Sequence, residues 1–445
     1  MSTVNYTNRI TYPQVWQSAA ERSLPTWLWA TTFVLLAALW FIDHDFSVIG
    51  RWDQAIGQTV ADAAKIRNAE WESGLMIRRV GFAVAAVWGV LLIFWAPRRQ
   101  VSKWQGPLAL LVGAYLALCF GSVLWSDQPL TTAKKLVIYA CMVVAAVGIG
   151  PAIRPRQLCL IATLVTTTLA LIGWSAELAT GAFRPWSSEY RLSGTLHPNT
   201  MGAYASVACI GAFCLWRFGR RAPWWGAIAF LMLALTALTK SRMALFALLA
   251  ALVIVSLGRM SRAGLATAGA YVLTAAAVVL LLLGVANRNV QGEAAGIVLL
   301  NRQDEVRSLT GRTPLWRELA THVAARPLLG HGFAGFWTTN RHVEVAKQIE
   351  WPAFHAHSAY LGAALELGVL GSGLWAAIVL FATYTAFTRF RGTTDPGYGF
   401  LLGVGAFVLT FSGTETMFFM MEGLVLIFLP GIALLALGDW EEESP

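Results

Sequence analysis

Charged residues are scarce in this chain. Asp, Glu, Lys and Arg make up 13% of its 445 residues, whereas hydrophobic residues make up 57%. A soluble domain normally carries about a quarter charged residues. The mean hydropathy of +0.58 agrees with this difference. The composition therefore excludes an ordinary soluble protein and predicts an all-α, polytopic integral membrane protein embedded in the lipid bilayer.

Cysteine is also scarce, and no C-x-x-C motif occurs. The five cysteines all fall within apolar runs, where cysteine behaves as a small apolar residue: Cys119, Cys141, Cys159, Cys209 and Cys214. This placement predicts no disulfide framework and offers neither a redox motif nor a structural zinc motif. No cofactor is expected.

Long apolar runs recur from near Trp27 to Leu437. A helix needs about 20 residues to cross a hydrocarbon core of roughly 30 Å, so these runs predict about twelve membrane spans. Their approximate centres are Leu35, Val87, Ala114, Val143, Val165, Ala208, Leu233, Leu249, Val278, Ala376, Gly405 and Ile427. The expected parts are residues 1–286 with nine spans, a large helical outer loop at 287–357, and three spans with an acidic inner tail at 358–445.

Basic residues predict the orientation, because short cytoplasmic loops retain Lys and Arg. With the N-terminus inside, every inner loop is basic: Arg98, Arg99 and Lys103; Arg154 and Arg156; Arg217, Arg220 and Arg221; Arg259 and Arg262; Arg389 and Arg391. The net charge of +9 is therefore explained by topology. Nucleic acid is not an expected partner, since the inner loops are short and their charges scattered.

Some basic residues fall on the outer side in this topology and need another explanation. Lys240 and Arg242 occupy a very short outer turn, T-K-S-R, and Arg191 lies in R-L-S-G-T-L-H-P-N-T. An anionic ligand at the outer face would account for them. Alternatively, long side chains at a helix end snorkel to the interface, and long outer segments tolerate charge.

Arg312 lies at the start of a predicted helix in the large outer loop. In T-G-R-T-P-L-W-R-E-L-A-T-H-V, Thr313 suits the N-cap and Pro314 the first helical position. Leu315, Leu319 and Val323 would share the buried face. An arginine at a helix N-terminus favours a phosphate group. The alternative is an ion pair with a nearby acid: Asp304, Glu305 or Glu318.

The turn that follows, L-L-G-H-G-F-A-G-F, contains Gly330, Gly332 and Gly335 in a formal G-x-G-x-x-G pattern. A dinucleotide fingerprint requires a preceding buried strand, and here a helix precedes it. We therefore expect the glycines to allow a tight turn against the membrane helices.

Four of the histidines in the large outer loop follow its predicted helix: His331, His342, His355 and His357. A metal site is one interpretation of H-x-H, but no third ligand stands at diagnostic spacing, so no metal is predicted. His357 fits a single acid or base better, because its pKa of roughly 6.5 lets it exchange a proton near neutral pH. A cap on the following helix is the alternative for His357.

Five motifs in order resemble the O-antigen ligase and polymerase superfamily. They are Arg191 in R-L-S-G-T-L-H-P-N, Arg242 in S-R-M-A-L, Arg312 in G-R-T-P-L-W, the turn P-L-L-G-H-G, and H-S-x9-G-x-x-G beginning at His357. The last motif is similar to the histidine pattern of the O-antigen ligases of lipopolysaccharide assembly. His331 departs from the family, which often has a small apolar residue there.

The resemblance implies a glycosyltransferase of the Gram-negative bacterial inner membrane with its site facing the periplasm. The donor would be a glycan on undecaprenyl diphosphate, and the acceptor a sugar hydroxyl of the lipid A-core. Arg191, Arg242 and Arg312 would bind the diphosphate, and His357 would act on the acceptor hydroxyl in a metal-independent, inverting transfer. Lys240, His355 and His331 are secondary candidates.

Three other functions fit parts of the same pattern. A polymerase of this superfamily would use the same donor with another lipid-linked repeat as acceptor, and a protein O-oligosaccharyltransferase would use Ser or Thr. A lipid or sugar transporter also fits about twelve spans. Transporters usually show internal repeats, and the two halves of this chain show none that is convincing.

Overall fold

A computed structural model describes residues 26–44, 60–95, 106–187, 190–219, 222–260, 312–349, 353–419 and 421–437. Within these ranges all regular secondary structure is helical. The helices are α2 (Thr26–Asp43), α3 (Val60–Trp95), α4 (Pro107–Gly121), η2 (Ser122–Leu124), α5 (Pro129–Ala152), α6 (Pro155–Thr180), α7 (Pro198–Phe218), α8 (Pro223–Leu238), α9 (Arg242–Leu257), α12 (Arg312–Ala325), α13 (Thr339–Ile349), α14 (Ala359–Gly392), α15 (Pro396–Phe411) and α16 (Val425–Leu437). The predicted all-α class is confirmed.

Several of the helices are long and apolar enough to cross a membrane. Six described segments meet this criterion, namely residues 77–95 of α3 and all or most of α4, α5, α6, α7 and α14. Shorter apolar helices are α2, α8, α9, α15 and α16. Each predicted centre lies in one of these helices except Val278, which is outside the described residues. The chain is a multi-pass membrane protein, but the predicted count of about twelve spans is not confirmed.

Small residues let the helices approach closely. α3 packs on α5, α7 on α8 and α6, and α14 on α15, which also contacts α9. Where α3 crosses α5, a Cβ on Gly148 would lie 2.2 Å from the carbonyl oxygen of Gly89. Membrane helices associate through such contacts, because lipid offers little hydrophobic drive for helix association.

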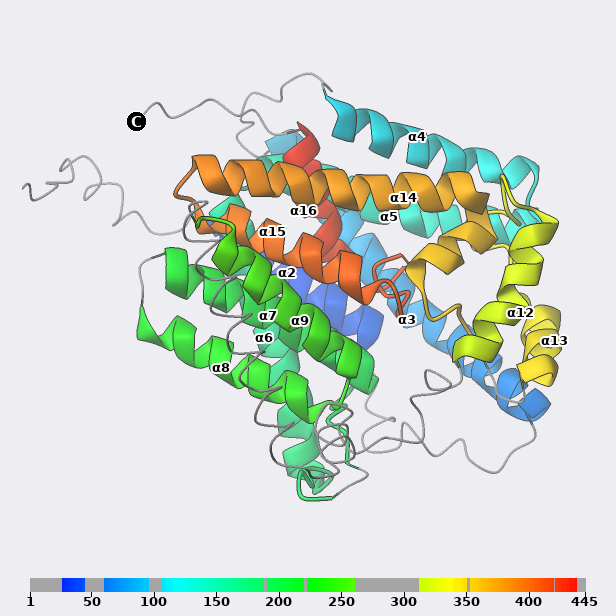
Figure 1. Cartoon of the computed structure of the whole chain (residues 1–445), viewed down its shortest axis with the longest axis horizontal. Coiled ribbons are helices and arrows are strands. Elements are labelled where there is room, and N and C mark those ends of the chain that lie inside the picture. The colour runs from blue at the N-terminus through cyan, green and yellow to red at the C-terminus, as the bar shows by residue number, and fades with distance from the viewer. Residues whose placement is uncertain are drawn as a thin grey trace, which may run out of the picture.

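The helices α12 and α13 form a small unit at one end of the bundle, beside the start of α14 (Figure 1); it is called the outer unit after the side predicted for it. Leu315 and Leu319 are fully buried there with Phe336 and Val345, and Val323 packs against them. The predicted buried face of α12 is therefore confirmed. The helix begins at Arg312, so Thr313 and Pro314 lie inside the helix rather than at the predicted cap and first position.

The predicted inner and outer basic residues lie at opposite ends of the same helices. Arg242 begins α9, whereas Arg259 follows its C-terminal end and donates from Nε to Phe390 O at the C-terminal end of α14 (3.0 Å). Arg191 precedes the N-terminus of α7, and Arg217 lies in its last turn. Among the described residues, one end of these helices thus carries candidate site residues and the other carries predicted inner basic residues. The predicted inner residues Arg98, Arg99, Lys103, Arg220, Arg221 and Arg262 lie outside the described residues.

Candidate functional site

A buried carboxylate stands at the centre of the candidate site. Glu415 lies in the loop between α15 and α16 and is 6% exposed. Its Oε1 lies 2.5 Å from Arg312 Nη2 and accepts a hydrogen bond of 2.7 Å from Asn199 Nδ2. Its Oε2 lies 3.8 Å from His357 Nδ1. One side chain therefore joins α12, the first turn of α7 and the segment before α14.

The surroundings of Glu415 keep it ionised. Burial raises the pKa of this carboxyl, but the interaction with His357 and the Arg312 charge outweigh burial and lower the pKa to about 2. A buried charge is tolerated when it is paired and hydrogen-bonded. The ion pair also means that Arg312 meets a protein carboxylate in the absence of substrate.

Arg191 is connected to the same cluster through Asn199. Its Nη2 donates to Asn199 Oδ1 (3.0 Å), and its Nε donates to Thr239 O (3.0 Å) in the turn between α8 and α9. Arg242 follows in that turn as the first, half-buried residue of α9. Arg191 and Arg312 thus approach Asn199 and Glu415 from different elements, which is the arrangement a multidentate anion needs.

Lys240 lies at the edge of this group. Its backbone has a φ of 50°, and its Nζ donates to Ser187 O over 3.4 Å. The left-handed backbone is uncommon for a residue with a Cβ and marks a tight turn. This turn carries both Lys240 and Arg242 beside the loop that contains Arg191.

His357 has a constrained backbone and is not the cap of its helix. Its φ is 47°, and Ser358 is the N-cap of α14, with the Ser358 side chain accepting from Leu361 N. The cap interpretation of His357 is therefore wrong. The side chain is 20% exposed, so it is accessible while facing Glu415. Residues held with positive φ cluster at functional sites.

His355 packs directly on His357, with 3.9 Å between the ring centroids. Its Nδ1 accepts a hydrogen bond from the His357 backbone N (3.2 Å). Burial lowers the pKa of His355 well below its usual range, and the His357 ring adds to this effect. His355 is consequently neutral near pH 7 and shapes the turn that presents His357.

The remaining loop histidines lie elsewhere. His331 Nδ1 lies 2.8 Å from Asp127 Oδ2, and its Nε2 lies 3.2 Å from His322 O. His342 stacks on Trp337, with 5.0 Å between ring centroids. The four histidines therefore occupy three separate places, which removes the geometric basis for one shared metal site.

The turn P-L-L-G-H-G fills a break in α14. Gly368 has a φ of 68°, and a Cβ there would lie 2.1 Å from Leu328 O. Backbone groups freed by the break are satisfied by the turn: Val369 N donates to Pro327 O (2.8 Å), and His331 N donates to Leu365 O (2.9 Å). The prediction that the turn packs against the membrane helices is confirmed, and the glycine of H-S-x9-G-x-x-G has a physical role.

Comparison with known proteins identifies the part of the chain that contains these motifs. Residues 227–376 match the sequence model of the family described as O-antigen ligase. This part of the chain therefore resembles the O-antigen ligase family. The exopolysaccharide production protein ExoQ of Rhizobium meliloti (strain 1021) is 25% identical over 299 residues, covering 64% of this chain and 67% of ExoQ. The predicted resemblance is confirmed, and the chain is related to the polysaccharide-related ligases and polymerases of this superfamily.

The O-antigen ligase region holds most of the predicted residues but not the whole cluster. Lys240, Arg242, Arg312, His331, His355 and His357 all lie within it. Arg191, Asn199 and Glu415 lie outside it, in chain segments that fold back onto the same end of the bundle. The candidate site is thus assembled from the matched region and from both of its flanks.

Asn199 and Glu415 are the site residues that sequence reasoning missed. Asn199 stands in the quoted motif H-P-N, but its amide had no visible partner in the sequence. Glu415 belongs to none of the motifs and is one of few acids near the C-terminal apolar helices, with Glu366 and Glu422. Glu366, nine residues after His357, accepts a hydrogen bond from Ala334 N (2.9 Å).

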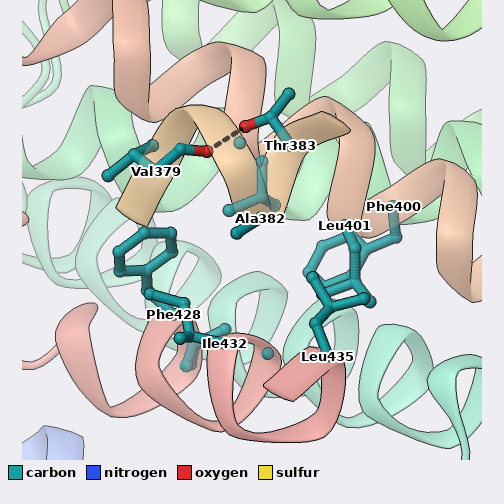
Figure 2. Close-up of a pocket in the computed structure, with 12 residues that line it drawn as sticks. Val379, Ala382, Thr383, Phe400, Leu401, Phe428, Ile432 and Leu435 are labelled. Carbon is teal, nitrogen blue, oxygen red and sulfur yellow. Dashed lines mark hydrogen bonds between the residues drawn. The ribbon is translucent and has the colours of Figure 1, made fainter. Parts of the chain in front are cut away.

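An apolar pocket lies between α14, α15 and α16, away from these polar groups (Figure 2). Val379, Phe400 and Phe428 are among its lining residues. The hydroxyl of Thr383 donates to Val379 O of its own helix (2.7 Å). None of the lining residues belongs to the polar cluster around Glu415, so the pocket contributes no residue to the candidate site.

Proposed function

We propose that this protein is a glycosyltransferase that moves a glycan from undecaprenyl diphosphate to a sugar hydroxyl of the lipid A-core. The transfer would take place on the periplasmic face of a Gram-negative inner membrane. The observation that carries the proposal is the cluster of Arg312, Asn199 and His357 around Glu415, with Arg191 attached through Asn199. The O-antigen ligase match and the basic loops at the opposite end support the reaction class and the orientation.

The arginines would hold the donor diphosphate. When the anomeric C–O bond breaks, its electron pair passes to the diphosphate, and negative charge grows on the leaving group. Preorganised guanidinium groups stabilise this charge without rearrangement at the moment of reaction. Arg191, Arg242 and Arg312 take this role. Arg312 exchanges part of its interaction with Glu415 for the arriving diphosphate oxygens.

His357 would take the proton of the acceptor hydroxyl. Its Nδ1 faces Glu415, so we assign Nε2 to the acceptor. The hydroxyl oxygen attacks the anomeric carbon from the side opposite the diphosphate, and the configuration inverts. The hydroxyl proton moves to Nε2, and the Glu415 carboxylate stabilises the imidazolium that results.

A transfer assay with purified protein tests the proposal. Wild type and His357→Ala are incubated with undecaprenyl-diphosphate-linked glycan and lipid A-core, with the exposed Arg317→Ala as a matched control. We expect the His357 variant to lose roughly 100-fold or more of the transfer rate and the control to keep it. An undiminished transfer rate in His357→Ala would contradict the catalytic role of His357. If wild type transfers no glycan to lipid A-core, the proposed function is wrong. Activity is expected to survive EDTA.

A glycan polymerase is the second candidate, and the name of the relative favours it. ExoQ is described as an exopolysaccharide production protein, a name that mentions polysaccharide and no lipid A. The donor subsite would be unchanged, and only the acceptor would differ. Offering wild type lipid A-core, an undecaprenyl-linked repeat and a serine-containing peptide in competition separates the two functions and also tests protein glycosylation.

A further inference from the structure

A second buried carboxylate lies beneath the loop that carries Arg191. Glu177, in the last turn of α6, is 1% exposed. Its Oε1 accepts from Ser193 N (2.8 Å), Ser193 Oγ (3.1 Å) and Gly194 N (2.6 Å), and its Oε2 accepts from Tyr190 OH (2.5 Å). Such a set of donors suits an ionised carboxylate, which only accepts. All four bonds go to residues within three positions of Arg191.

The loop is pressed tightly onto α6 at the same place. Gly194 has a φ of 61°, and a Cβ there would lie 2.6 Å from Gly173 Cα, one helical turn before Glu177. The backbone oxygen of Glu177 also accepts from Ala182 N (2.9 Å) and Phe183 N (3.2 Å). A single residue of α6 therefore fixes both the start of the connection after α6 and the segment that carries Arg191.

Arg191 is held between this anchor and the active-site end of the bundle. Leu192 N donates to Leu238 O (2.9 Å), which ties the loop to α8. The Arg191 guanidinium then reaches Thr239 O and the Asn199 amide. Since Asn199 also donates to Glu415, a shift of the loop would move the arginine relative to the whole cluster.

We propose that Glu177 is a positioning residue for Arg191 and thereby sets the affinity of the diphosphate subsite. This inference rests on the proposed function. Glu177 touches no substrate, because it is buried under the loop. A displacement of about 1 Å in a group that binds the reacting substrate weakens catalysis strongly. The effect should therefore appear in donor use and leave acceptor use unchanged.

The test compares the KM for the lipid-diphosphate donor with the KM for the acceptor. Glu177→Ala removes the acceptor of four hydrogen bonds and should raise the donor KM about tenfold or more. Glu177→Gln keeps an oxygen for Ser193 N and Gly194 N and should restore most of the affinity. Tyr190→Phe removes one bond and should raise the donor KM about threefold. Leu178→Ala, exposed on the same helix, is the matched control and should leave both KM values unchanged.

A double variant shows whether Glu177 acts through Arg191. If it does, adding Glu177→Ala to Arg191→Ala should raise the donor KM little further. Additive effects would overturn the inference, as would an unchanged donor KM in Glu177→Ala or equal rises for donor and acceptor. If Glu177→Ala does not fold, Glu177→Gln and Tyr190→Phe are compared with wild type instead. The donor KM relative to the acceptor KM then decides. Arg191→Ala with an unchanged donor KM would instead contradict the proposed function.

Discussion

Arg312 and Glu415 are joined by an ion pair of 2.5 Å, although 103 residues separate them in the chain. The pair links the outer unit of α12 and α13 to the loop before α16. Removing one partner leaves the other as an uncompensated, largely buried charge, which is strongly destabilising. We expect Glu415→Ala to lower kcat/KM roughly 100-fold, because Arg312, Asn199 and His357 lose their common partner.

The matched control for Glu415→Ala is Glu318→Ala. Glu318 pairs with His322 within α12 over 3.5 Å and is 26% exposed, so its loss should alter kcat/KM less than about threefold. A steady-state transfer assay measures both. Equal losses of kcat/KM in Glu415→Ala and Glu318→Ala would show that Glu415 is no more important for transfer than Glu318.

The stability of the protein should depend on Glu415 at acid pH. The native pKa of about 2 is lower than the ordinary value of 4.5, so the stabilisation is complete above about pH 4.5 and is lost as the pH falls toward 2. Thermal unfolding midpoints measured in detergent from pH 6 to pH 3 should fall more steeply for wild type than for Glu415→Gln. Parallel curves would show that this carboxyl is not stabilised in its charged form.

Gly368→Ala should destabilise the protein through the break in α14. The positive φ is strained for alanine, and the new Cβ would meet Leu328 O at 2.1 Å. We expect a loss of about 1–3 kcal/mol or more, seen as a lower unfolding midpoint. Gly373→Ala on the same helix is the control, because nothing lies within 4 Å of its Cβ position. The hypothesis fails if both variants melt at the same temperature.

His331→Ala should weaken the fold without changing donor affinity. His331 is 3% exposed and contacts Asp127 and the backbone of His322. Loss of these contacts should cost about 1–3 kcal/mol, while Arg312 and His357 keep their own partners. The unfolding midpoint and the donor KM are the two measurements. A raised donor KM with a normal midpoint would instead support the secondary role predicted for His331.

The sequence predicted the helical class and the positions of most apolar helices, because long apolar runs are a strong local signal. The long apolar runs at α6, α7 and α14 show no competing pattern. The buried face of α12 was predicted correctly because its apolar residues recur at helical spacing. The start of α12 was misplaced, since Thr-Pro marks a helix start only on average.

Pairing between distant residues was much harder to predict. For Arg312 the sequence predicts a phosphate ligand, with an ion pair to Asp304, Glu305 or Glu318 as the alternative; Asp304 and Glu305 lie outside the described residues. The partner is Glu415, which the packing of α14 and α15 brings near. Asn199 was missed because an amide next to a proline has many ordinary roles. Neither residue has a local pattern that indicates its contact.

The break at Gly368 divides α14 into two parts with different neighbours. Leu365 is fully buried and Leu361 partly buried against Leu315 and Phe336 of the outer unit. Other residues of the same part, Ala359, Ala363 and Leu367, are buried in the core of the bundle, and Ala359 N donates to the backbone oxygens of Ser412 and Glu415. Residues 359–367 therefore join the outer unit to the bundle. The proposed proton acceptor directly precedes this joint, so its position relative to Glu415 is held from both sides.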